Sequence, residues 1–192
     1  VALSEYAPGR TVVVNKRTYR VGAITAATAV NESRKARPLF DHPGRYLQCA
    51  NCLNTMSPET GVEGQSCPVC AASPMDPITV IQPQIAWPQD GRPVDEFDDD
   101  QEYTETTLAQ LPVPASDAAF ETPRRFGVRS EVRFGRQVPL VIVNRGPVVG
   151  GQPKGFRVCR DCGHVPLGDA PYKPHRRHYR LPPYVRASDR CH

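Results

Sequence analysis

Two closely spaced pairs of cysteines constrain the fold of this chain more than any other feature. Cys49 and Cys52 form one C-x-x-C pair, and after fourteen further residues Cys67 and Cys70 form a second. Two intervening residues let the backbone turn once and aim both sulfurs at one ion, so two pairs complete a tetrahedral shell with no open position for a substrate. The doubled pair predicts a structural zinc site. A redox dithiol and buried thiols without metal are the alternatives.

A third C-x-x-C pair, at Cys159 and Cys162, predicts a second zinc knuckle. Gly163 follows it, and glycine suits the positive φ that such a turn often needs. Twenty-eight residues separate Cys162 from Cys191, which we expect to be a third ligand. The fourth ligand stays open: it is either a residue beyond position 192 or one of the histidines His164, His175, His178 and His192. The alternative to a second site is a half-site with ordinary surface histidines.

Charge is segregated along the chain. Residues 1–45 carry a net charge of +5, residues 46–123 of −12 and residues 124–192 of +11, which together give the formal +4. Such asymmetry is typical of a protein in which one part approaches a polyanion. Seven carboxylates lie between Asp95 and Glu105. We interpret this acidic run as a solvated, mobile loop. The alternatives are a segment that mimics nucleic acid and a divalent-metal nuclease site.

The remaining sequence predicts short strands and much irregular chain, because 21 of the 192 residues are proline and 14 are glycine. Valine-rich residues 11–14 and residues 18–21 flank a polar turn and predict a hairpin. Residues 23–36 fit a short helix or a loop equally well. The further expected strands are residues 78–81 and 84–87, with Pro83 indicating an edge strand, then two or three strands within residues 126–134 and 138–143, and one at residues 155–158. The expected fold class is α+β, β-rich and loop-heavy, with two zinc knuckle or ribbon elements.

Four segments are expected along the chain. They are an N-terminal β-hairpin segment (1–45), a first zinc ribbon (46–88), an acidic mobile loop (89–123) and a basic β segment with the second knuckle (124–192). The sequence starts at Val1 and stops beside a cysteine, so we interpret it as a fragment of a larger protein. It shows no signal peptide and no apolar run near the ~20 residues of a membrane span. These features favour a cytoplasmic protein without a membrane partner.

Basic and aromatic residues interleave in the last segment and predict contacts with DNA, single-stranded in particular. In an unbroken strand, Arg129 and Arg133 would share one face. Residues 173–186 contain five Lys or Arg, two His, two Tyr and no acid, which suits a phosphate backbone with stacked bases. A solvated loop or a docking surface for protein is the alternative. The candidate DNA contacts are Arg129, Arg133, Arg176, Arg177, Tyr179 and Arg180.

Several strings, taken in order, resemble a known family. They are LSEYAPG (3–9), VVVNKRTY (12–19), YLQC (46–49), VNRG (143–146), GFRVCRDCG (155–163) and a histidine-containing stretch up to Cys191. This order is similar to the cysteine-rich C-terminal domain of unknown function of bacterial DEAD/DEAH-type DNA helicases. MrfA-type repair helicases carry one version, and the DISARM anti-phage proteins DrmA and DrmB look similar. The acidic middle of the chain matches no part of this pattern, and motor domains are absent.

The resemblance implies a zinc-binding accessory function beside a helicase motor, in DNA repair or phage defence. It supports two clusters, one of Cys49, Cys52, Cys67 and Cys70 and one of Cys159, Cys162 and Cys191, and it favours His175 as the fourth ligand of the second. In the family the ATPase chemistry belongs to other domains, so we do not expect this chain to be an enzyme. The expected function is to guide DNA or to dock the motor. A protein-interaction scaffold is the alternative, and a metal-dependent nuclease is less favoured.

Overall fold

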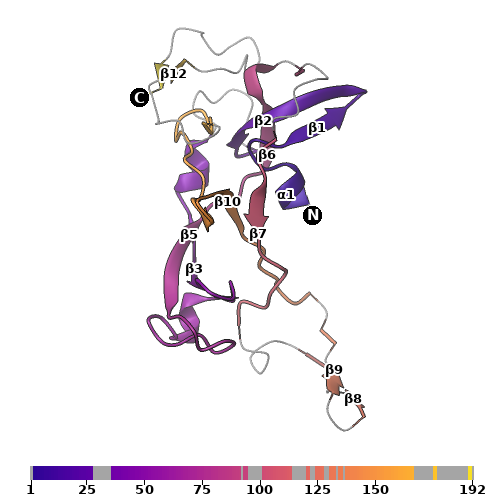
Figure 1. Cartoon of the computed structure of the whole chain (residues 1–192), viewed down its shortest axis with the longest axis vertical. Coiled ribbons are helices and arrows are strands. Elements are labelled where there is room, and N and C mark those ends of the chain that lie inside the picture. The colour runs from indigo at the N-terminus through magenta and orange to yellow at the C-terminus, as the bar shows by residue number, and fades with distance from the viewer. Residues whose placement is uncertain are drawn as a thin grey trace. The chain divides into compact units, whose positions relative to one another are not determined.

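The computed structural model describes residues 2–27, 36–91, 93–94, 101–113, 120–121, 124–127, 130–132, 134–135, 137–166, 175–176 and 190–191. The chain divides into two compact units, each assembled from separate stretches (Figure 1). Unit 1 comprises Val1–Pro43, Ile81–Thr106 and Asn144–His192, and unit 2 comprises Gly44–Val80 and Thr107–Val143. Small sheets dominate the described residues, with few and short helical elements. The predicted β-rich, loop-heavy fold class is therefore confirmed.

The first sheet of unit 1 is built on a tight hairpin. Its strands are β1 (Thr11–Val14), β2 (Arg17–Thr25) and β6 (Ile85–Pro88), in the order β1-β2-β6. Figure 1 shows β1 and β2 side by side. Asn15 and Lys16 both have positive φ, at 50° and 61°, which matches the twist of a two-residue hairpin turn. The predicted hairpin is confirmed, and β6 is an edge strand as predicted.

The second sheet of unit 1 joins distant parts of the sequence. It comprises β7 (Thr104–Thr106), β10 (Asn144–Val149) and β11 (Gln152–Pro153), in the order β11-β10-β7. An ion pair of 2.8 Å between Arg145 and Glu105 links β10 to β7. The remaining elements of unit 1 are α1 (Ala2–Glu5), η1 (Arg37–Phe40), η3 (Gln89–Gly91), β12 (His175–Arg176) and β13 (Arg190–Cys191). Among the described residues, no helix is long and apolar enough to cross a membrane.

Unit 2 contains a three-stranded sheet and a small hairpin. The sheet has the order β4-β3-β5, formed by β3 (Gly44–Cys49), β4 (Thr55–Met56) and β5 (Met75–Val80). The hairpin pairs β8 (Arg124–Phe126) with β9 (Ser130–Val132), and η2 (Pro58–Thr60) follows β4. Buried side chains of the sheet and of the cysteine segment form one core: Leu47, Cys49, Met56, Cys67 and Met75.

Two of the predicted strands are wrong. Residues 138–143 form only an isolated bridge, between Val141 and Gln110, and the regular strand begins at Asn144. Pro139 lacks the N–H that a strand ladder needs, so regular pairing starts only beyond it. Residues 154–159 are not a strand either. Gly155 has a φ of 69°, which turns the backbone out of the extended region.

Candidate metal centre

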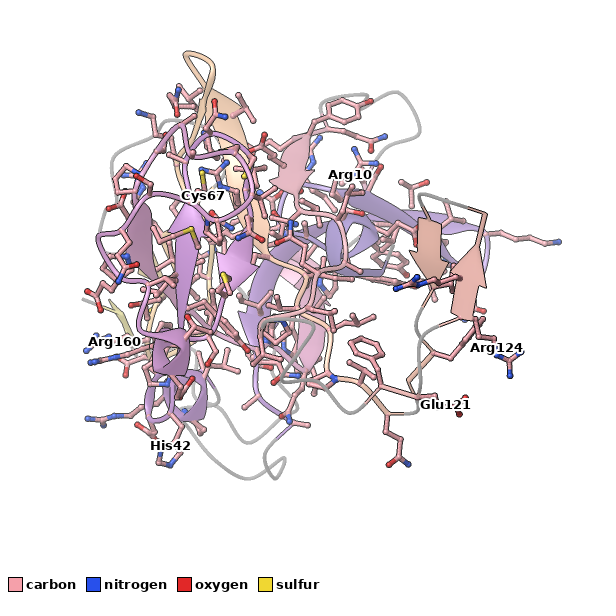
Figure 2. The ribbon with its side chains drawn as sticks, turned by 90° about the horizontal axis from the view of Figure 1, so that it is seen from below. Arg10, His42, Cys67, Glu121, Arg124 and Arg160 are labelled. Atoms are coloured by element: carbon pink, nitrogen blue, oxygen red, sulfur yellow. The ribbon has the colours of Figure 1, made fainter. Side chains whose placement is uncertain are left out.

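The four cysteines of the doubled pair lie together in unit 2. Their sulfur atoms all lie within 4.8 Å of one another. Cys49 Sγ lies 3.6 Å from Cys70 Sγ, and Cys52 Sγ lies 3.6 Å from Cys67 Sγ, so each contact joins one pair to the other. Four thiolates bound tetrahedrally at ~2.3 Å would be about 3.8 Å apart. The sulfurs are therefore spaced as a tetrahedral metal site requires. Figure 2 labels Cys67 among the sulfur atoms drawn in yellow.

Each cysteine pair owes its shape to a tight backbone turn. Leu53 donates its N–H to the carbonyl of Cys49 at 3.0 Å, and Ala71 donates to the carbonyl of Cys67 at 2.9 Å. Leu53 and Ala71 each follow the second cysteine of a pair, and they have positive φ of 61° and 56°. These turns bring both sulfurs of a pair to the same side of the backbone.

The cluster is part of the hydrophobic core of unit 2. Cys49 ends β3 and lies opposite Met75, the first residue of β5, and both are fully buried. The Gln110 side chain stabilises the first turn with two hydrogen bonds. Its Oε1 accepts from the Thr55 N–H at 2.6 Å, and its Nε2 donates to the Leu53 carbonyl at 3.2 Å. Gln110 was not predictable as part of the site, because no local pattern in the sequence connects it to residues more than fifty positions earlier.

The thiols have unequal pKa values, because their surroundings differ. The Ala72 N–H and the Asn51 side-chain amide, 3.6 Å from the sulfur, lower the pKa of Cys70 to about 6. Burial, together with the neighbouring thiols, raises the pKa of Cys52 to about 12. The Cys70 thiolate therefore forms readily near neutral pH, whereas a full set of four thiolates needs a cation to offset the charge. A soft S₄ donor set of this kind fits zinc.

The third cysteine pair, in unit 1, has the same pattern of backbone hydrogen bonds as the first pair. Gly163 donates to the carbonyl of Cys159 at 2.8 Å, and the Cys159 N–H donates to the His164 carbonyl at 2.9 Å. The corresponding bonds of the first pair are Leu53 to Cys49 at 3.0 Å and Cys49 to Asn54 at 2.9 Å. Gly163 has a φ of 79°, so the residue after the second cysteine again has positive φ. The third pair is thus folded as a knuckle, with both cysteines buried.

This knuckle pairs with β2. The Ile24 N–H donates to the Gly163 carbonyl at 3.0 Å, and the Val165 N–H donates to the Gly22 carbonyl at 2.9 Å. Between these bonds, His164 forms an antiparallel bridge with Ala23. The buried inner half of β2 therefore holds the Cys159–Cys162 turn in place.

The other predicted site residues are placed only in part. In the β12–β13 pair the backbone of His175 lies directly opposite that of Cys191, and Arg176 lies opposite Arg190. The structure therefore brings Cys159 next to Cys162, and His175 next to Cys191, in unit 1. The predicted residues outside the described part of the chain are Arg129, Arg133, Arg177, His178, Tyr179, Arg180 and His192.

Comparison with known proteins gives one informative similarity. The chain is 34% identical over 184 residues, 93% of its length, to Druantia protein DruE of Escherichia coli (strain UMEA 4076-1). It spans only 10% of the length of that relative. No protein-family model matches the chain, and no solved structure matches it. The expected membership of the MrfA and DISARM group stays a prediction.

Proposed function

We propose that this chain is a zinc-stabilised accessory module of an anti-phage defence protein and that it contacts DNA. The observation that carries the proposal is the similarity to DruE, an anti-phage defence protein, along nearly the whole chain. The module has a closed four-cysteine cluster, which suits a structural rather than a catalytic metal. Any motor or ATPase activity would then belong to other parts of the system, and the place of action would be the cytoplasm.

We further propose a second zinc, bound by Cys159, Cys162, Cys191 and His175. Its support is twofold: the first two ligands lie on a turn that repeats the hydrogen bonds of the first knuckle, and the other two are backbone partners in the β12–β13 register. Residues directly opposite in an antiparallel pair have Cβ atoms ~4.5–5.5 Å apart, which is compatible with two ligands of one ion.

The metal content of the purified chain tests both sites. We expect two zinc ions per chain, and one after Cys159→Ala, because that change removes a ligand of the second site only. His175→Ala should also reduce the content, whereas His42→Ala is the control, since His42 is an exposed histidine in unit 1. Elemental analysis that finds one zinc in the unaltered chain would refute the second site. A loss with Cys159→Ala but not with His175→Ala would refute only the choice of histidine.

DNA binding is proposed for the basic C-terminal segment. Residues 124–192 carry a net charge of +11, and phosphate contacts from such residues give affinity without base preference. A stacked base on Tyr179 would add ~1–3 kcal/mol. The same charges would also suit an acidic surface of a partner protein. Salt-dependent binding of an oligonucleotide distinguishes DNA binding from such protein docking.

The test is a titration of the 192-residue chain with single-stranded DNA at two salt concentrations. Each phosphate contact contributes about −0.7 to the slope of log K against log [salt]. Arg176→Ala with Arg177→Ala should flatten the slope by about 1.4 on that basis. The charge-matched control is Lys16→Ala with Arg17→Ala, in the exposed turn of the β1–β2 hairpin. The protein-interaction scaffold would be favoured if the chain does not bind the DNA. It would also be favoured if the affinity changes neither with salt nor with the Arg176→Ala and Arg177→Ala substitutions.

A further inference from the structure

An arginine at the tip of the Cys159–Cys162 knuckle stacks on an aromatic ring from a distant part of unit 1. The Arg160 guanidinium lies over the Phe40 ring, with its central carbon 5.6 Å from the ring centroid. Phe40 ends η1, and a backbone contact of 3.5 Å from the Ala36 N–H to the Asp161 carbonyl joins η1 to the knuckle. Ala36 and Leu39 are buried, so η1 is anchored on its inner side.

The stacked arginine keeps its hydrogen-bonding edge available. Arg160 is exposed, and within the described part of the chain it forms no ion pair with a carboxylate. A guanidinium in a cation–π contact with a ring still presents N–H donors in a planar fork, which matches two oxygens of a phosphate. Because the ring limits its rotation, less side-chain entropy is lost when it binds.

Two further side chains that can donate hydrogen bonds to an anion lie on η1 and next to it. Arg37 and His42, at the two ends of the η1 segment, are exposed. Figure 2 shows the Arg160 and His42 side chains on the same side of the view, both pointing outward. Within unit 1, residues 144–160 contain four Arg or Lys and no acid. Asp41 and Asp161 are the nearby acids in sequence and balance the charges of Arg37 and Arg160, so the arrangement suits contact of the Arg160 fork with a single phosphate rather than a broad polyanion track.

We infer that Arg160, stacked on Phe40 and accompanied by Arg37 and His42, binds a backbone phosphate of the nucleic acid. This inference rests on the proposed DNA binding and adds a contact that neither the sequence patterns nor the comparison assigns. Arg160 stands between two cysteines, so the knuckle that holds a metal also holds this side chain. Metal at the second site and phosphate binding by Arg160 are thereby coupled.

Four variants of the 192-residue chain test the contact by titration with a thymidine-only oligonucleotide. Arg160→Ala should weaken binding roughly tenfold, the typical effect of losing hydrogen bonds to a charged group, and should flatten the salt slope by about 0.7. Arg160→Lys keeps the charge but loses the fork, and Phe40→Leu keeps the arginine but loses the ring, so both should weaken binding by a smaller factor. Arg17→Ala, an exposed arginine on the β1–β2 hairpin, removes the same charge and should have little effect.

The outcomes separate this contact from the proposed function. If the unaltered chain binds no oligonucleotide, both the proposed DNA binding and the Arg160 contact are refuted. If the chain binds but Arg160→Ala behaves like Arg17→Ala, the DNA binding stands and the Arg160 contact is refuted. Equal zinc content in all four variants shows that a loss of affinity does not come from a damaged knuckle. Equal affinities of Phe40→Leu and the unaltered chain would refute the role of the stack.

Discussion

Replacing Cys67 with alanine is expected to remove the metal from the four-cysteine cluster and to unfold the sheet of unit 2. Cys67 is 2% exposed and lies in the core cluster with Leu47, Cys49, Met56 and Met75. Structural zinc sites contribute apparent binding energies of ~10–16 kcal/mol, which act as folding energy. The core of unit 2 is small, so we expect unit 2 to be unfolded in most molecules that lack the metal.

The measurement combines zinc content with circular dichroism of the β structure. Cys67→Ser keeps the size of the side chain but not the thiolate, so it should lose the metal to the same extent as Cys67→Ala. The matched control is Val69→Ala in the same turn, because Val69 is 70% exposed and its N–H, not its side chain, contacts the Cys67 sulfur. Equal zinc in Cys67→Ala and the unaltered chain would show that the cluster does not bind it.

Local patterns predicted what depends on local geometry. The β1–β2 hairpin follows from valine-rich strands around Asn15 and Lys16, which tolerate the positive φ of the turn. The first cysteine cluster follows from spacing, because two residues between cysteines are enough to define each turn. The knuckle at Cys159 was predicted in the same way, and Gly163 has the positive φ expected for it.

Contacts between distant residues were not predictable from such patterns. The pairing of β7 with β10 joins residues about forty positions apart, and neither segment has a sequence period that identifies its partner. The two units are each built from separate stretches of chain, whereas the sequence predicts four consecutive segments. Arg160 and Phe40 lie 120 positions apart, so their stacking depends on the fold of unit 1 alone. Composition identified the basic segment but not which arginine is held in place.

Gly163→Ala is expected to cause a large loss of stability in unit 1. An added Cβ would lie directly against the carbonyl oxygen of Ile24. Ile24 belongs to β2, the strand that holds the knuckle. Gly163 also has a φ of 79°, which costs a residue with a Cβ roughly 1–2 kcal/mol. Relief of the clash requires the knuckle to move off β2, and overpacking of this kind costs ~1–3 kcal/mol. The two contributions together predict a loss of about 2–5 kcal/mol.

Urea unfolding followed by tryptophan fluorescence measures this loss of stability in unit 1, which contains both Gly163 and the fluorophore. Trp87 is the single tryptophan, lies in β6, and donates its Nε1 hydrogen to Thr25 Oγ of β2 at 2.7 Å. Gly151→Ala is the matched control: Gly151 belongs to unit 1 and has a φ of 77°, but an added Cβ there meets nothing within 4 Å. It carries the backbone cost without the clash, so it should lose only about 1–2 kcal/mol.

The difference between the two glycine variants isolates the contact of the knuckle with β2. If Gly163→Ala is clearly less stable than Gly151→Ala and also loses one zinc, the close approach of Gly163 to Ile24 positions the second metal site. Equal losses in the two variants would mean that the backbone conformation alone accounts for the effect. The knuckle would then be held by its own turn and its proposed metal. Leu53 after the first pair and Ala71 after the second adopt the same positive φ with side chains present.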